Sequence, residues 1–294
     1  PAFLAFDTLG IWVGKFETGY DGATSTTGTQ VNSVDTSKIV IKPNVYSWRN
    51  INVGNAFKNS YDYQRELDSH MMKNTEWGSV AYLQHSKYGS MISVRINNNS
   101  SYITSYASTS EPTLGYNGTS IDGNRYESTG LGADGTYTIN YLNQKSVVAS
   151  TTNNYSGIYD MSGGAWEYVM GYTTGATTVG GSSSITSLYS DFFNDSNYLK
   201  YWDKYTSTVK MDYNNRILGG ATGEMGPFEF ENTVSDTRYK SSWHKNYAYF
   251  ATSSSSWFIR GGGFDCGTES GLFSFSSDNG GIRAHISYRI VLAP

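Results

Sequence analysis

The chain has 294 residues, a formal net charge of −4 at pH 7, only 16% charged residues and 15% aromatic residues. A chain of this length and aromatic content can bury a sizeable core, in one large domain or two ordinary ones. It has no stripe of Lys and Arg to hold a phosphate backbone, so we expect no nucleic-acid partner. No apolar run approaches the roughly 20 residues that cross a bilayer, which argues against membrane insertion.

Further features of the composition favour an extracellular binding protein. Ser, Thr, Asn and Gly are abundant where a cytosolic protein carries Lys and Glu, and Tyr occurs 25 times. The single cysteine, Cys266, rules out an intramolecular disulfide. The chain opens at Pro1 without a basic and apolar leader, so we expect that any export signal or anchor was removed or never present.

Strands are predicted at both ends of the chain. Alternating apolar residues indicate a strand or hairpin at 3–19, and a short strand broken by a proline is expected at 39–45. The run at 290–292 is β-branched and apolar, as in a buried strand. We expect the strand around Trp12 to pair near the strand around Ile290, because one shared sheet would remove two exposed edges.

Two helices are predicted, both in the first third of the chain. Apolar residues at helical spacing indicate the first at 47–67, with Ser47 as its N-cap. The second is expected to start at Asn74 or Thr75, whose side chains can accept hydrogen bonds from unpaired amides, and to run towards Gly89.

The rest of the chain divides into long polar stretches and a distinctive terminal segment. Insertions rich in Tyr, Ser and Asn at about 93–151 and 173–245 are predicted to be ordered, because long loops without a purpose are rare in compact domains. The segment 257–289 begins with three glycines, which permit close backbone approach, and its middle is small, polar and aromatic. Such a stretch is typical of an adaptable recognition surface held on rigid strands.

Four short stretches share one family pattern. They read GIWVGKFE at 10–17, NTEW at 74–77, GIYDMSGGAWEYV at 157–169, and RGGGF at 260–264 closed by SYR at 287–289. In this order they resemble the successive signatures of the formylglycine-generating-enzyme, or sulfatase-modifying-factor, domain. The resemblance implies one domain over 1–294 with an α+β, C-type-lectin-like fold, loop-rich, with two helices and small antiparallel sheets.

The resemblance allows an enzyme or a binding protein, because the family contains oxidases and non-catalytic members. Cys266 falls on the first copper-binding cysteine of the oxidases, but Gly271 stands where their second cysteine would be. Copper(I) is held by a pair of soft thiolates, so an oxidase is disfavoured. The histidines show no metal-ligating spacing either, whether helical or strand-like: His70, His85, His244 and His285. We therefore expect no enzymatic activity, and interpret these histidines as surface or helix-end residues.

Two carboxylates in the third stretch, Asp160 and Glu167, could flank a reacting bond in a glycosidase. The resemblance instead implies a structural turn and strand, with Trp166 packed in the core and carboxylates that bond backbone amides. It also allows for a structural calcium ion near this segment. Here, however, Gly164 replaces the asparagine that is usual in the family.

The departures from the oxidase pattern favour a binding protein. Retroelements diversify some members of the family by mutating adenines in Asn codons. Many residues of the terminal segment are among the amino acids that such mutations can produce. The candidate ligand-binding residues are Asp265, Cys266, Thr268, Ser274, Ser276, Ser277, Asp278, Ile282, Arg283 and His285. A Ser- and Gly-rich loop that arose by ordinary drift is the alternative origin.

The predicted function is therefore non-enzymatic recognition of a protein or glycan on a cell or virion surface, through the terminal segment. Candidates are a variable protein of a diversity-generating retroelement and a receptor-binding protein of a phage tail or a bacterial surface. A formylglycine-generating-type oxidoreductase and a sugar-binding module that uses Trp and Tyr platforms are the alternatives.

Overall fold

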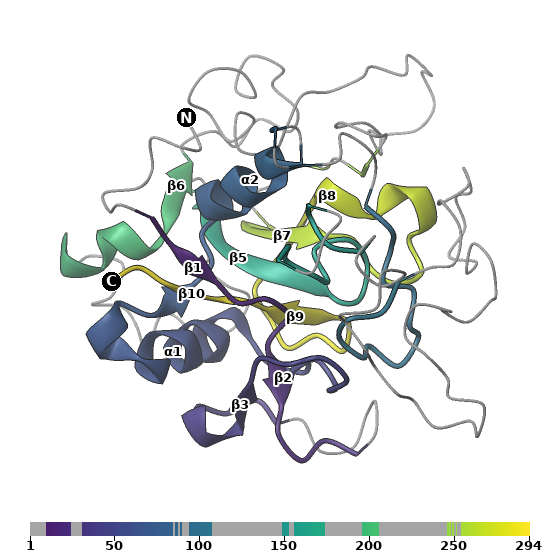
Figure 1. Ribbon diagram of the computed structural model, residues 1–294. Coiled ribbons are helices and arrows are strands. Elements are labelled where there is room, and N and C mark those ends of the chain that lie inside the picture. The colour runs from purple at the N-terminus through teal and green to yellow at the C-terminus, as the bar shows by residue number, and fades with distance from the viewer. Residues whose placement is uncertain are drawn as a thin grey trace.

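The computed structural model describes residues 10–24, 31–84, 86–87, 89, 94–107, 149–152, 156–173, 196–205, 246–247, 249, 251 and 254–294. Within them it has mixed α and β content, with two α-helices, small sheets and a curled sheet of five strands (Figure 1). The expected α+β class is thus confirmed. The predicted insertions at 93–151 and 173–245 lie mostly outside the described residues.

The two helices lie where apolar spacing predicted them, with different ends. Helix α1 (Val53–Tyr63) begins at Asn52, whose side-chain oxygen accepts a hydrogen bond from the amide of Asn55 at 2.8 Å. The prediction that Ser47 caps this helix is therefore wrong. Helix α2 (Asn74–Leu83) begins at Asn74, as expected, and ends before Gly89. Its N-cap is Lys73, whose amide donates to the Glu76 carboxylate at 2.8 Å, so the predicted capping by Asn74 or Thr75 is wrong.

The large sheet is built around the long strand β5 (Trp166–Thr173). On one side β5 pairs antiparallel with β7 (Trp257–Gly261), which in turn pairs with β8 (Gly271–Asp278). On its other side it pairs in parallel with β9 (Ile286–Tyr288) along its first half and with β6 (Asp203–Tyr205) along its second. The first and last parts of the terminal segment therefore lie on opposite sides of β5.

The chain ends meet in a smaller antiparallel sheet. Strand β10 (Ile290–Leu292) lies between β1 (Trp12–Val13) and β4 (His70–Met71), with Trp12 opposite Leu292. The predicted pairing of the two ends is thus confirmed. A separate pair joins β2 (Gly19–Tyr20) to β3 (Ile39–Val40). Short 3-10 helices occur as η2 (Thr36–Lys38), η3 (Arg65–Leu67), η5 (Ser196–Tyr201) and η8 (Gly267–Glu269).

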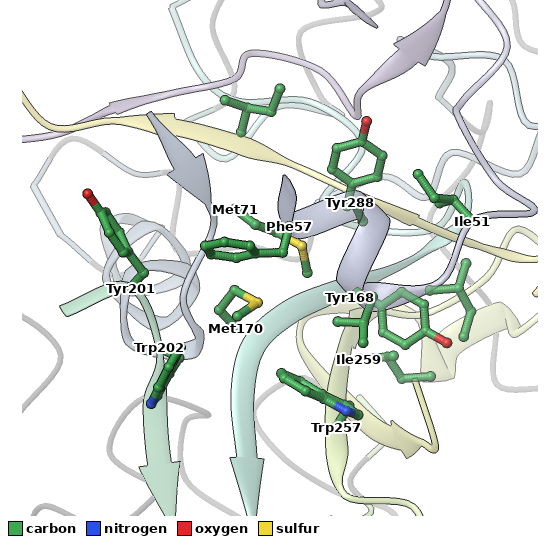
Figure 2. Close-up of a cluster of buried hydrophobic side chains, with 14 of the residues drawn as sticks. Ile51, Phe57, Met71, Tyr168, Met170, Tyr201, Trp202, Trp257, Ile259 and Tyr288 are labelled. Carbon is green, nitrogen blue, oxygen red and sulfur yellow. The ribbon is translucent and has the colours of Figure 1, made fainter. Parts of the chain in front are cut away.

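Two hydrophobic clusters cover the two faces of β5, because successive side chains of a strand point to opposite faces. Tyr168 and Met170 pack on the side of α1, against Phe57, Trp257 and other buried residues (Figure 2). On the opposite face Val169 packs in a second cluster with residues of α2, β7 and β8. Side chains thus pack on both faces of the large sheet, and the loops that connect its strands start from a packed framework.

The burial of Trp166 and of His70 differs from the prediction. The resemblance implied that Trp166 packs in the core, but Trp166 is only partly buried, whereas Trp257 is buried at 1% exposure. His70 is not a surface residue: its ring is buried, with Nε2 2.9 Å from the Glu76 carboxylate and Nδ1 2.8 Å from the carbonyl oxygen of Asp68. The pairing with Glu76 raises the pKa of His70 against the effect of burial.

Candidate functional site

The loop after β7 is folded tightly by glycines. Gly261 and Gly262 have φ values of 90° and 81°, which L side chains rarely adopt. A Cβ atom on Gly262 would lie 2.5 Å from the Cα atom of Ser270, so the two ends of the loop must pack against each other. The hydroxyl of Ser270 also donates to the carbonyl oxygen of Gly263 at 2.7 Å. This closure holds residues 264–266 at the surface.

The loop between β8 and β9 is fixed by a second set of contacts. One oxygen of Asp278 accepts hydrogen bonds from the Tyr168 hydroxyl at 2.6 Å and from the amide of Gly280 at 2.9 Å. Its other oxygen accepts from Nε of Arg283 at 2.8 Å, and Nη2 of Arg283 donates to the Asn279 side chain at 3.1 Å. Residues 282–285 are consequently presented on a closed loop.

A third segment reaches the same region from the middle of the chain. Tyr102 has a φ of 56°, and its carbonyl oxygen accepts from the amide of Ser47 at 3.0 Å. The guanidinium of Arg49 lies 3.9 Å from the centre of the Tyr102 ring and also donates to the carbonyl oxygen of Ala284. Arg49 is buried, so it links Tyr102 to the β8–β9 loop from the interior side of the surface.

These three segments meet at one surface. The rings of Tyr102 and Phe264 are in edge contact, with centroids 5.0 Å apart. The amide of Trp166 donates to the carbonyl oxygen of His285 at 3.0 Å, and the Trp166 ring lies against the 263–266 loop. We call this surface the terminal face, and define it by the residues Tyr102, Phe264, Asp265, Cys266, Ile282, Arg283, Ala284 and His285.

The structure places the predicted binding residues in different surroundings. Five of them belong to the terminal face, where Asp265, Ile282 and His285 are exposed and Cys266 and Arg283 are half-buried. Ser276, Ser277 and Asp278 are half-buried on β8, and the side chain of Thr268 lies outside the described residues. Ser274 is fully buried, which corrects its assignment.

Burial also explains the correction at Ser274. Strand β8 alternates its faces, and Ser274 lies in its inner part, where both faces of the sheet are covered. The polar side chain resembles that of a loop residue in sequence, but no ligand can reach it. The prediction treated the middle of the segment as a presented surface, whereas eight of its residues form strand β8.

Tyr102 was missed by the sequence analysis. It lies 162 positions before Phe264 in the chain, inside one of the predicted insertions, and only the fold brings the two together. The recurrence of Tyr in that insertion was the one signal available, and it did not distinguish this tyrosine from its neighbours.

The thiol of Cys266 is held in its neutral form. Burial raises its pKa to about 12, although the amide of Gly263 donates to Sγ at 3.3 Å and opposes the shift. A thiolate is the form that attacks substrates and binds metals. A cysteine could not stand at Gly271 without rearrangement, because a Cβ atom there would lie 2.1 Å from the side-chain amide of Asn246. The second thiolate of a copper pair is therefore missing at position 271.

Asp160 and Glu167 belong to a buried network. Arg289 donates to both oxygens of Glu167, at 3.0 and 2.5 Å, and to the carbonyl oxygens of Gly14 and Tyr159. Burial raises the pKa of Glu167 to about 7, while Arg289 opposes the shift. Both carboxylates are at most 1% exposed, so they cannot flank a bound sugar. Their structural interpretation is supported.

The same network does not fit a calcium ion. Glu17 accepts from the Ser47 hydroxyl and from the amide of Ala165, and one oxygen of Asp160 accepts from an amide and from a side chain. Calcium needs six to eight oxygen ligands. In the described part of the chain, no group of three or more His, Cys, Asp or Glu side chains could hold a metal ion.

Comparison with known proteins gives no family assignment. No model of a protein family matches the chain, and no curated protein matches it either. The function is therefore inferred from the burial, contacts and charges of the described residues. Among these residues, no helix has the length and apolar character of a membrane span.

Proposed function

We propose that the protein recognises a protein or glycan ligand at the terminal face and catalyses no reaction there. The observation that carries the proposal is the convergence of exposed and half-buried side chains from three distant chain segments on a closed backbone. Polar, charged and aromatic groups are mixed on this surface, as on antibody paratopes.

The backbone beneath the face supports a recognition role, because preorganised loops lose less conformational entropy on binding. Asp278 ties the β8–β9 loop to Tyr168, which is itself buried in the core. Arg49 joins the same loop to Tyr102 from below. Side chains on such loops can change while the loops keep their course.

The enzymatic alternative, a formylglycine-generating-type oxidoreductase, lacks support at Cys266. The thiol is the only one in the chain, whereas copper(I) is held by a pair of thiolates. Copper-dependent oxidation of a cysteine-containing peptide by the wild-type protein, lost in Cys266→Ser, would overturn the proposal.

The finer proposal is that the domain has a C-type-lectin-like fold and is a variable protein of a diversity-generating retroelement, or a receptor-binding protein of a phage tail or bacterial surface. Its support is the distribution of residues in the terminal segment. Residues that adenine mutagenesis could produce include the exposed Asp265, Ile282 and His285, whereas Gly261, Gly262 and other framework positions are buried. An extracellular location follows from this proposal. A reverse-transcriptase gene beside an adenine-biased near-copy of the 3′ end of this gene would support it.

Binding itself is tested with the isolated protein on a glycan array and on a panel of bacterial cells. We expect Ile282→Asp to abolish the binding seen with wild type, because a charge would replace an exposed apolar contact. Trp12→Ser is the matched control, since Trp12 is also exposed and apolar but lies on β1. Binding that Trp12→Ser abolishes and Ile282→Asp retains would place the ligand elsewhere and refute the proposal.

A further inference from the structure

Tyr102 occupies a backbone conformation that is uncommon for a bulky residue. Its φ of 56° lies in the left-handed region, where side chains other than Gly, Asn and Asp are rare. The conformation is maintained by hydrogen bonds on both sides: its amide donates to the carbonyl oxygen of Asn99 at 2.9 Å, and its own carbonyl oxygen accepts from Ser47. Residues in such conformations cluster at ligand-binding sites, where surrounding contacts maintain them.

The Tyr102 side chain is positioned as firmly as its backbone. Arg49 covers one face of the ring, and the rings of Tyr102 and Phe264 are in edge contact at an interplanar angle of 86°. No described residue accepts a hydrogen bond from the Tyr102 hydroxyl or donates one to it. Burial raises the pKa of this hydroxyl, Arg49 opposes the rise, and Asp265 adds to it. The phenol is therefore neutral and can donate a hydrogen bond.

Among the described residues around Tyr102, one exposed carboxylate forms no ion pair. Arg283 is engaged by Asp278, and the buried Arg49 is engaged by the carbonyl oxygen of Ala284 and the Tyr102 ring. Partial desolvation lowers the pKa of His285, so its imidazole is neutral at pH 7. Asp265 is exposed and forms no ion pair with any described residue. Asp265 is therefore the exposed charge at this surface that no described residue pairs, whereas the positive charge of Arg49 is buried beneath the Tyr102 ring.

We propose that Tyr102, Phe264 and Asp265 form a subsite for a basic side chain, Lys or Arg, of a protein ligand. The proposal rests on the proposed function and narrows its ligand to a protein. Asp265 would pair with the ammonium or guanidinium group, and the two rings would contact the aliphatic stem, which long cationic side chains bury readily. The Tyr102 hydroxyl supplies a further polar contact at the rim.

The ring geometry favours this ligand over a sugar. Sugars stack on a broad aromatic face, and the two rings of the subsite are perpendicular to each other. One face of Tyr102 is already covered by Arg49, so that face cannot stack on a sugar. An angled pair of rings with a carboxylate beside it instead surrounds an elongated chain that ends in a positive charge.

The test begins with a random peptide library panned against the wild-type protein. We expect enriched peptides to share a Lys or Arg, and replacement of that residue by norleucine or citrulline to lower affinity about tenfold, or 1.4 kcal/mol. Asp265→Asn should lower affinity for the parent peptide by a similar factor and have little further effect on the substituted peptide. Asp21→Asn, an exposed carboxylate on another loop, is the matched control.

Tyr102→Phe separates the hydroxyl from the ring, and we expect it to lower affinity less than Asp265→Asn. Enriched peptides that bind equally well to wild type and Asp265→Asn overturn the subsite. If Ile282→Asp still abolishes their binding, the terminal face remains the binding surface and only the basic-residue proposal fails. A selection that yields no peptide dependent on Asp265 overturns the subsite as well. The melting temperature of each variant should match wild type, because the altered groups are at the surface.

Discussion

Replacing Asp160 by Asn should stabilise the protein at alkaline pH. Asp160 is fully buried, and its Oδ1 accepts hydrogen bonds from the amide of Ser105 at 2.7 Å and from Asn97 at 2.9 Å. Its Oδ2 has no hydrogen-bond partner of normal geometry among the described residues. An Asn keeps the carbonyl oxygen in place of Oδ1, carries no charge, and tolerates the φ of 63° at this position.

The magnitude follows from proton linkage. Burial raises the pKa of Asp160 from 3.8 to about 6, against the attraction of Arg289. Between these two values the folded protein binds more protons than the unfolded chain, so stability falls as the pH rises. At about 1.4 kcal/mol for each pH unit, ionisation of this group costs on the order of 3 kcal/mol by pH 8. The amide introduced by Asp160→Asn does not titrate, so the variant avoids that loss of stability. Its NH2 group would be left without a hydrogen-bond partner, which costs about 1–3 kcal/mol and reduces the gain.

Urea unfolding at pH 5 and pH 8 provides the measurement. We expect wild type to be less stable at pH 8, and Asp160→Asn to reduce the difference between the two pH values. His70 contributes in the same direction, because its raised pKa means that stability is lost as its proton leaves. The comparison is therefore between variants, and Asp21→Asn controls for the change in net charge. A pH dependence identical in wild type and Asp160→Asn would refute the reasoning.

Four further substitutions test the buried framework and the terminal face. Cys266→Ser should change the free energy of unfolding by only about 0.5 kcal/mol, because a hydroxyl can also accept from the amide of Gly263; a thermal melt checks this. Trp257→Ala should cost about 3–5 kcal/mol in urea unfolding, and Trp166→Ala clearly less, because only Trp257 is fully buried. Asp278→Ala should destabilise the β8–β9 loop and speed its amide hydrogen exchange; unchanged exchange would contradict the role given to this carboxylate.

Apolar periodicity predicted the elements whose environment is local or repetitive. The helical spacing of Val53, Ala56 and Phe57 located α1, and the apolar run at 290–292 located the strand that joins the chain ends. The start of α1 was predicted wrongly because Ser47 and Asn52 are both good caps in sequence. Only the fold assigns the Ser47 hydroxyl to Glu17 and leaves Asn52 to the helix.

The binding surface was predictable only where it is continuous in sequence. The small and polar residues in the middle of the terminal segment identified it as a recognition surface, and Asp265 and His285 are indeed exposed there. Tyr102 could not be identified, because its place depends on Arg49 and on the loop beside Phe264. Burial of Ser274 depends on the strand pairing of β8 with β7, and a Ser-rich sequence does not indicate it.

The contacts of the β8–β9 loop separate the positions that can vary from those that cannot. Arg283 was expected to be a contact residue, but its guanidinium binds Asp278 and Asn279 within the loop. A change at Asp278 would remove an acceptor from the Tyr168 hydroxyl, the amide of Gly280 and Arg283 at the same time. Ile282 and His285 are exposed on the same loop, and their side chains have no such role. Ligand choice can therefore change most readily at the exposed positions of the terminal face, while Asp278 and Arg283 preserve the course of the loop.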